Sequence, residues 1–298
     1  MEEEAKQPVK VSVLIVSFNN AAALRRCLAS LERSKNREAM EIIVVDNGSR
    51  DESPQLDSEF PGATFLRLPH NFGLTKALNI GVRTSVAEYI FFLHADTEVL
   101  PETVSALAGK LDAQADAVAV CPLLVTPGGE AESSVRRLPD AGSLYSEWRN
   151  GQPAEGAGVD RTEETVPVEY PEAAAMMARG YFVKGMRYFD ERYGEFGAHE
   201  ELCYQIQRAS KKTLIFPSIA VVHYGDHLPF DKLPSGARGL LSADRALGSA
   251  VYVSKHCGFL AGLKFRLTCI FTSLLSLQFA CLSRLIGGQK IDGTQRDL

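Results

Sequence analysis

Residues 88–97 read EYIFFLHADT, and this stretch decides the fold. Its first part, residues 89–93, is apolar or aromatic and uncharged, which is typical of a strand buried on both faces of a parallel sheet. His94 and Asp96 follow directly, and side chains two positions apart on an extended backbone point the same way. Open α/β sheets bind ligands at the carboxyl ends of their strands. We therefore expect an imidazole and a carboxylate at a ligand-binding edge, where both can bind a divalent cation.

The end of this strand also has a purely structural interpretation. Asp96 or Thr97 could cap a helix that opens with Pro101 in its first turn, since carboxylates and hydroxyls are favoured caps and proline suits the first turn. The remainder of the chain favours the metal-binding interpretation.

Strand and helix patterns alternate on both sides of this stretch. Apolar runs end at polar clusters, and between them apolar residues recur at helical spacing. This order predicts an α/β fold with a right-handed, mostly parallel sheet and helices on both faces. The predicted strands are 11–17, 41–45, 64–68, 89–93 and 117–121. Ser49 with Glu52 predicts a capping box for a short second helix.

The alternation lapses over residues 122–171, which are rich in Gly, Pro and acidic residues. This stretch is too long for a plain connection, so we interpret it as a functional or mobile insertion. A helix near 200–209 and a pair of strands, 213–216 and 219–222, are predicted after it. We expect one α/β domain over residues 1–234 and a helical appendage over residues 235–298.

Composition narrows the class of protein. The 298 residues carry a net charge of −5 with scattered Lys and Arg, which disfavours nucleic acid as a partner. The six cysteines form no C-x-x-C pair, which predicts reduced thiols in a cytoplasmic protein. The first ten residues, MEEEAKQPVK, are acidic and lack the apolar segment of a signal peptide.

Asp46 ends the second predicted strand. A carboxylate there can accept hydrogen bonds from a base or from ribose hydroxyls, although it can equally cap a helix. No G-x-G-x-x-G follows the first strand and no Walker loop occurs in the sequence, which disfavours dinucleotide and P-loop sites. A nucleotide site without such a glycine cradle must neutralise its diphosphate otherwise, and a metal held by His94, Asp96 and His223 would do so.

Four motifs carry a family resemblance: VSVLIVSFNN, EIIVVDNGSRDES, NFGLTKALNIGV and EYIFFLHADT. In order and spacing they resemble the GT-A core of family 2 inverting glycosyltransferases, and most closely the rhamnosyltransferase-like branch. The later run AAAMMARGYFVKGMRYFDERYGEFGAHEELCYQI resembles that branch's acceptor-side segment. IAVVHYG resembles its strand-end histidine, and YVSKHCG resembles its K-H-x-G stretch.

The resemblance implies a nucleotide-sugar donor and a divalent metal, Mg²⁺ or Mn²⁺. Asp96 matches the last carboxylate of the family's D-x-D metal motif, and His94 stands where that motif often has Asp or Asn. His223 matches a histidine that completes the metal site in some members. The positions implied near the sugar nucleotide are Ser17, Asn19, Asp46, Asn71, Gly73, Asn79 and Asp96.

One departure from the branch falls at the helix that bears the catalytic base. The branch reads F-G-E-D-x-D-L-C, and this chain reads FGAHEELC at residues 196–203. His199 therefore stands where the family has Asp, and an imidazole can act as a general base. The alternatives are that Glu200 reaches in instead, or that the protein binds a sugar nucleotide without turning it over. Glu201 replaces the second Asp, and we expect it to hold backbone or a basic partner.

Residues 267–283, LTCIFTSLLSLQFACLS, carry no charge, while Lys264, Arg266 and Arg284 flank them. A membrane-spanning helix needs about 20 apolar residues, so this run is marginal. A helix lying in the membrane interface, or packed on a partner chain, fits better. The structural alternative is a buried helix of the domain.

The function that we expect is an inverting, metal-assisted glycosyltransferase of cell-surface polysaccharide or glycan synthesis. Its partners would be a nucleotide-sugar donor, a saccharide or lipid-linked acceptor and the inner face of a membrane, with no nucleic acid. The alternative is a catalytically weak sugar-nucleotide-binding protein on the same scaffold. A Rossmann dehydrogenase and a nucleotidyltransferase are disfavoured, because the glycine-rich phosphate loops of both are missing.

Overall fold

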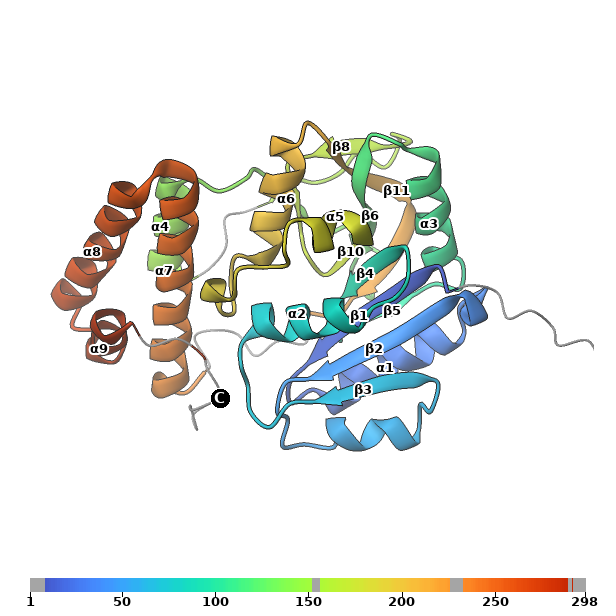
Figure 1. Ribbon diagram of the computed structural model, residues 1–298, viewed down its shortest axis with the longest axis horizontal. Coiled ribbons are helices and arrows are strands. Elements are labelled where there is room, and N and C mark those ends of the chain that lie inside the picture. The colour runs from blue at the N-terminus through green and yellow to red at the C-terminus, as the bar shows by residue number, and fades with distance from the viewer. Residues whose placement is uncertain (1–8, 152–155, 226–232, 289–290, 292–298) are drawn as a thin grey trace, which may run out of the picture.

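The computed structural model describes residues 9–151, 156–225, 233–288 and 291. The acidic start of the chain, on which the expectation about a signal peptide depends, lies outside the described residues. Within them, nine strands form one sheet in the order β3-β2-β1-β4-β10-β6-β11-β5, with β8 paired to β11 (Figure 1). The strands are β1 (Val11–Ser17), β2 (Met40–Asp46), β3 (Ala63–Arg67), β4 (Tyr89–Leu93), β5 (Thr97–Val99), β6 (Ala117–Val125), β8 (Val166–Val168), β10 (Ala175–Arg179) and β11 (Lys212–His223).

The half of the sheet made by β3, β2, β1 and β4 is parallel throughout. All five residues of β4 are buried, as its uncharged run predicted. The sheet continues through β10, which runs antiparallel between β4 and β6. The expectation of an α/β fold with a mostly parallel sheet is therefore confirmed. The antiparallel β10 was not predicted as a strand.

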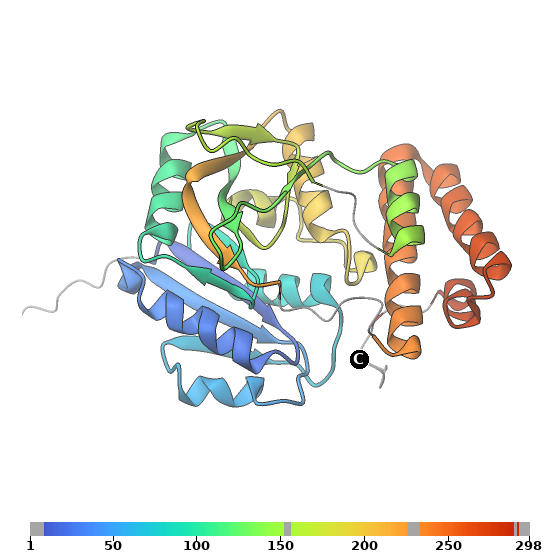
Figure 2. The same ribbon diagram turned by 180° about the vertical axis from the view of Figure 1, so that it is seen from behind.

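Helices cover both faces of the sheet (Figures 1 and 2). Leucines of α1 and α3 share one buried cluster with β1, β2 and β4. Apolar residues of α2 and α6 share a second cluster on the opposite face. The helices of this part are α1 (Ala21–Glu32), α2 (Leu74–Thr84), α3 (Thr103–Ala113), α5 (Gly180–Gly185) and α6 (Ala198–Arg208), with the short turns η1 (Arg37–Ala39), η2 (Ser53–Ser58) and η3 (Glu191–Tyr193).

Four helices gather at one end of the molecule, away from the sheet (Figures 1 and 2). They share a third apolar cluster, in which Trp148 of α4 donates a hydrogen bond from Nε1 to the carbonyl of Ser242 at 3.0 Å. These helices are α4 (Ala141–Asn150), α7 (Ser235–Cys257), α8 (Phe259–Leu275) and α9 (Phe279–Gly287). The stretch 122–171 thus has regular structure of its own: the end of β6, then β7 (Val135–Arg136), α4, β8 and β9 (Tyr170–Pro171).

The capping box predicted at Ser49 is wrong, and the capping alternative for Asp96 and Thr97 is excluded. Ser49 does not cap a helix; its Oγ accepts a hydrogen bond from the Asn19 backbone at 2.9 Å, and the element that follows is the short 3-10 turn η2. Asp96 and Thr97 do not cap α3 either. The unpredicted strand β5 begins at Thr97, and α3 starts only at Thr103. Asp96 is thereby left facing the sheet edge.

Two further elements differ from expectation. The predicted strand pair 213–216 and 219–222 is one long strand, β11, with a register shift between Phe216 and Ala220. The uncharged run 267–283 is two helices, because α8 ends at Leu275 and the chain turns at Leu277, which has φ 55°. No helix among the described residues has the length and apolar character to cross a membrane.

Candidate active site

His94, Asp96 and His223 come together at the carboxyl end of β4. The chain leaves β4 through His94 and Asp96 into β5, which pairs antiparallel with β11 so that His223 lies opposite Thr97. The backbone N–H of Tyr224 donates to the Asp96 carbonyl at 3.0 Å, which fixes this crossing. One ligand atom from each of the three residues lies within 4.8 Å of the others. The sequence expectation that these three side chains meet is confirmed.

Glu132 holds the second nitrogen of His223. Its Oε2 lies 3.0 Å from Nδ1, while the Nε2 atom of the same ring lies 3.5 Å from Oδ2 of Asp96. Burial lowers the pKa of His223, but the carboxylates of Asp96 and Glu132 outweigh burial and raise that pKa to about 9. A carboxylate behind a histidine is the usual way to orient a metal-binding imidazole. Glu132 was missed because it lies in the 122–171 stretch, 91 residues from His223, with no motif around it.

The next strands of the same edge bring polar groups beside this cluster. Asp46 ends β2 opposite Ser17 at the end of β1. One oxygen of Asp46, Oδ2, accepts from the Ser49 backbone at 3.2 Å. The other, Oδ1, is buried and has no hydrogen-bond partner within the described residues. A buried acceptor left without a donor is costly, so this oxygen marks a place where a ligand could donate.

Asn19 and Asn71 brace the two loops that frame this edge. Asn19 has φ 51°, and its Oδ1 accepts from the Arg50 backbone at 2.8 Å. Oδ1 of Asn71 accepts from Nδ2 of Asn47 and from the backbone of Gly73, both at 2.9 Å. These amides hold loop backbone within the structure, while Asp46 keeps a free acceptor.

Gly73 and Asn79 tie helix α2 to the segment before α6. Gly73 has φ 83°, and a Cβ there would lie 3.2 Å from the carbonyl carbon of Gly194, so a side chain would force the two segments apart. The amide of Asn79 accepts from the Phe189 backbone N–H and donates to the Phe189 carbonyl, each at 2.9 Å. Asn79 therefore positions the Phe189 segment.

His199 lies at the start of α6 on the buried side. Its ring meets the ring of Phe92 edge-on with centroids 5.9 Å apart, and Phe92 is two residues before His94 on β4. Burial lowers the pKa of His199 to about 4, so the imidazole is neutral at pH 7. Its Nε2 atom is buried without a hydrogen-bond partner in the described part of the chain. The structure thus brings His199 next to the strand that carries the metal-ligand candidates.

Glu200, the next residue of α6, lies near Glu147 of α4 and Arg245 of α7. Burial raises the pKa of the Glu200 carboxyl, and the nearby Glu147 carboxylate of α4 acts in the same direction. A hydrogen bond with Tyr170 and the guanidinium of Arg245 partly oppose this increase. A carboxylate whose pKa is raised accepts a proton more readily, which suits a general base.

Glu201 holds the helix α7, as expected of a residue that meets a basic partner. Its buried carboxylate lies 2.7 Å from Nε2 of His256 and 3.0 Å from Nζ of Lys255. Tyr193 and Gln205 donate to the same carboxylate. Lys255 and His256 belong to the YVSKHCG motif, which was therefore a usable signal for this contact.

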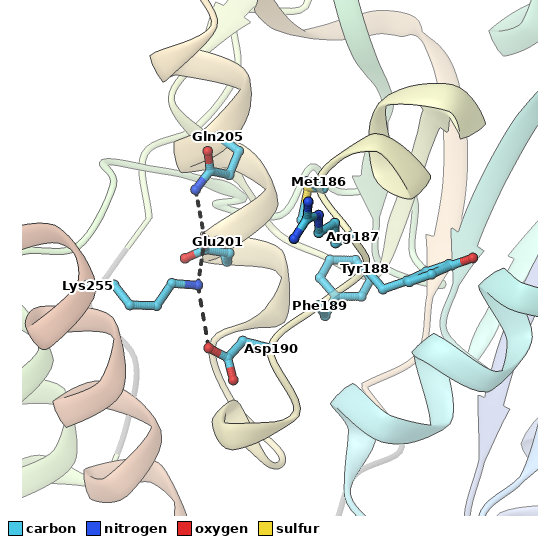
Figure 3. A pocket seen from close by; sticks show the side chains of 8 residues that line it. All are labelled: Met186, Arg187, Tyr188, Phe189, Asp190, Glu201, Gln205 and Lys255. Atoms are coloured by element: carbon cyan, nitrogen blue, oxygen red, sulfur yellow. Dashed lines mark hydrogen bonds and ion pairs between the residues drawn. The ribbon is translucent and has the colours of Figure 1, made fainter.

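A hollow of about 390 Å³ opens beside this network, between α6, α7 and residues 186–190 (Figure 3). Lys255 reaches across it toward Glu201 and Asp190, and Gln205 lines the side of α6 (Figure 3). Arg187 and Tyr188 on the opposite wall both have positive φ, 62° and 67°. Successive left-handed residues other than glycine are uncommon and are often found at functional sites.

Glu195 is a further titratable group that sequence reasoning missed. Its Oε2 accepts from the backbone of Leu74, at the first turn of α2, at 3.0 Å. Burial, together with the neighbouring carboxylate of Asp244, raises the pKa of Glu195 to about 7. No sequence signal distinguished it from other acidic residues, because its surroundings come from α2 and α7.

Comparison with known proteins gives the relationship of the chain. Residues 12–181 match the family model described as glycosyl transferase family 2. An N-acetylglucosaminyl-diphospho-decaprenol L-rhamnosyltransferase of Mycobacterium tuberculosis is 24% identical over 234 residues, which are 72% of this chain and 76% of that protein. An N-acetylglucosaminyltransferase of Mesorhizobium japonicum is 31% identical over 136 residues, which are 44% of this chain and only 32% of that protein.

Solved structures resemble the fold. The mannosyltransferase PcManGT of Pyrobaculum calidifontis, in complex with GDP-Man and Mn²⁺, has a TM-score of 0.56 at 15% identity, over 95% of this chain and 76% of that one. S. aureus TarS in complex with UDP-GlcNAc has a TM-score of 0.55 at 15% identity, over 85% of this chain and 72% of that one. Since the family model spans more than half of the chain and the neighbours are GT-A glycosyltransferases, the chain belongs to glycosyl transferase family 2 and has the GT-A fold.

Proposed function

We propose that this protein transfers a sugar from a nucleotide-sugar donor to an acceptor hydroxyl, with inversion at the anomeric carbon and with the help of a divalent metal. The observation that carries the proposal is the sheet edge, where His94, Asp96 and His223 converge at the end of β4, two strands along the sheet from β2. There the Oδ1 atom of Asp46 has no hydrogen-bond partner within the described residues. Binding of a nucleotide-sugar donor needs a metal to neutralise the diphosphate and an acceptor for hydrogen bonds from the nucleoside. The three ligand candidates and Oδ1 of Asp46 meet these two needs.

His94, Asp96 and His223 would hold the metal. One carboxylate suits Mg²⁺ and Mn²⁺ alike, but two imidazoles favour Mn²⁺ over Mg²⁺. When bound, the cation would stabilise the negative charge of the departing diphosphate. Glu132 would keep Nε2 of His223 directed at it by holding Nδ1.

The general base would come from α6. His199 is unprotonated at neutral pH, but the burial that keeps it neutral also disfavours the imidazolium that forms when it accepts a proton. Glu200 has a raised pKa and lies near Glu147 of α4 and Arg245 of α7. We keep His199 as the candidate that the register of the motif favours and Glu200 as its competitor, while Glu201 contributes by holding α7.

We further propose a lipid-linked saccharide as the acceptor, in cell-surface glycan synthesis. The support is the M. tuberculosis relative, whose name specifies a sugar on diphospho-decaprenol. Such an acceptor would keep the protein in the cytoplasm at the inner face of a membrane. The alternative is a weakly catalytic sugar-nucleotide-binding protein, which the loss of the Glu-Asp pair at Ala198 and His199 favours.

The deciding experiment is calorimetric titration of UDP-, GDP- and dTDP-linked sugars into the full chain, with Mn²⁺ or with EDTA. We expect one donor to bind only with metal and the Asp96→Ala variant not to bind it. Glu163→Ala, which removes an exposed carboxylate outside the candidate site, should bind like wild type. Equal affinity in EDTA would contradict the metal-assisted mechanism. Donor hydrolysis measured without acceptor separates an enzyme from a binding protein.

A further inference from the structure

Helix α8 has two apolar faces, and only one of them is covered. Its buried residues are Gly262, Phe265, Cys269 and Ser273, of which Phe265 and Cys269 belong to the cluster shared with α7. The other face carries large side chains that are 44–76% exposed. These are Leu260, Leu263, Leu267, Phe271 and Leu274.

The exposed residues form a regular stripe. At 100° per residue, the five positions fall within an arc of roughly 80°, and its centre lies roughly opposite the buried face. A helix with apolar residues on opposite sides is normally buried on both. In Figures 1 and 2, however, α8 lies at the outer end of the molecule, with α7 between it and the sheet.

The exposed apolar surface continues from α8 into α9 across residues 275–279, which we call the α8–α9 corner. Leu275, Leu277 and Phe279 at this corner are 67%, 69% and 62% exposed. Outside α8, α9 and the turn between them, the large exposed apolar side chains of the described chain are only Val86, Leu100 and Tyr181. Scattered exposed leucines need no explanation, but a concentration of this kind marks an interaction surface.

Charge identifies the partner. Helices α8 and α9 contain Lys264, Arg266 and Arg284 and no Asp or Glu, in a protein whose net charge is −5. Lys264 lies at the edge of the exposed stripe, and its ammonium group makes no ion pair within the described residues. Two copies of the chain meeting through this face would bring like charges together, whereas anionic lipid headgroups would neutralise them.

We infer that the outer face of α8 and the α8–α9 corner dock on an anionic membrane surface, with both helices lying in the interface. Neither helix is able to span a bilayer, which fits insertion of apolar side chains to the depth of the headgroup boundary. This inference takes its purpose from the lipid-linked acceptor of the proposed function, but its evidence is independent of the catalytic site. α7 then joins the docked face to α6, which carries the candidate base.

Sedimentation with vesicles tests the inference on the full chain, without donor, metal or acceptor. We expect the protein to bind vesicles of phosphatidylglycerol and phosphatidylcholine, and to bind phosphatidylcholine alone more weakly. The double variant Leu267→Glu with Phe271→Glu should lose about tenfold or more in partitioning, since two inserted apolar groups become charged. Lys264→Glu should reduce only the dependence on phosphatidylglycerol.

The matched control is Val86→Glu with Leu100→Glu, which changes two exposed apolar residues of the α/β part and should bind like wild type. Unchanged thermal unfolding of every variant shows that the fold is intact. The inference is overturned if wild type stays in the supernatant or if the α8 double variant binds equally. It is also overturned if light scattering shows a dimer that this variant dissociates, with no vesicle binding. A protein that binds vesicles but no nucleotide sugar would instead refute the proposed function alone.

Discussion

The carboxylate of Glu201 on α6 lies 2.7 Å from Nε2 of His256 on α7, and both side chains are more than nine-tenths buried. Tyr204 adds a ring whose centroid lies 3.7 Å from that of His256. The helix that begins with the candidate base is therefore joined to the C-terminal helices by a charged, hydrogen-bonded contact. Motion of α7 relative to α6 would have to break this contact.

Glu201→Ala should destabilise the protein by about 3–5 kcal/mol, because it leaves the buried side chains of His256 and Tyr193 without their carboxylate. Burial alone would raise the pKa of Glu201, but the hydrogen bonds from Tyr193, Gln205, His256 and Lys255 outweigh it and hold that pKa below its usual range. The stabilisation is thus present above the unfolded pKa, about 4.3, and is lost as pH falls through the lower folded pKa.

Thermal unfolding of wild type and Glu201→Gln between pH 7 and pH 3 measures this effect. We expect the difference in stability between the two proteins to shrink toward acid pH. Glu163→Gln, at an exposed position, should follow wild type throughout. A difference between Glu201→Gln and wild type that stays constant over the whole range would show that the ionised form of Glu201 is not what stabilises α7.

Glu132→Gln should weaken Mn²⁺ binding by about 10–100-fold while leaving His94, Asp96 and His223 in place. The reason is that Glu132 holds Nδ1 of His223 at 3.0 Å and so directs Nε2 toward Asp96. Titration with Mn²⁺ alone measures the affinity. Glu130→Gln, an exposed neighbour in the same segment, is the control. An affinity of Glu132→Gln equal to that of wild type would mean that His223 is oriented without Glu132.

The sequence predicted the edge of the sheet better than the surroundings of α6. His94, Asp96 and Asp46 could be placed because they follow directly on strands whose apolar runs are unambiguous. Glu132 and Glu195 could not, since their partners come from elements about 50 to 120 residues away. β5 was missed because three residues between a turn and Pro101 carry no pattern of their own.

The C-terminal helices show the same limit. The charge-free run 267–283 predicted an apolar segment correctly, but the turn at Leu277 has no Gly or Pro to announce it. α7 covers one face of α8 by packing against Phe265 and Cys269. This contact is tertiary, so the sequence of α8 alone does not reveal which face is covered. Local periodicity gave a helix here, and only the fold distinguishes its covered face from its exposed one.

Asp46→Asn should raise the dissociation constant of the donor by about tenfold to a hundredfold, the usual cost of losing a hydrogen bond to a charged group. Oδ1 of Asp46 has no hydrogen-bond partner among the described residues, and an amide can still accept from the Ser49 backbone through its remaining oxygen. Calorimetry with the donor found in the screen gives the constant. Glu52→Gln, exposed on the same segment, should bind normally. Unchanged affinity of Asp46→Asn would remove Asp46 from the nucleotide site.

The identity of the base can be decided by pairing two variants with the pH profile. If His199 accepts the proton, His199→Ala should lower kcat by roughly 10²–10⁴ with donor binding little changed, and Glu200→Gln should retain most activity. Because burial lowers the pKa of His199 to about 4, kcat would then not fall through ionisation of the base between pH 8 and pH 6.

If Glu200 is the base, Glu200→Gln should lose the activity and His199→Ala should retain most of it. The dependence of kcat on pH then also changes. Burial raises the pKa of Glu200, so its carboxylate becomes protonated, and kcat falls, at a higher pH than for an ordinary glutamate. Measurements at saturating Mn²⁺ and donor keep metal and donor binding out of the pH profile.

Glu195→Gln belongs in the same series of variants. Because the pKa of Glu195 is raised to about 7, protonation of this carboxylate would make kcat fall near neutral pH. Full activity in both His199→Ala and Glu200→Gln would place the base outside the start of α6.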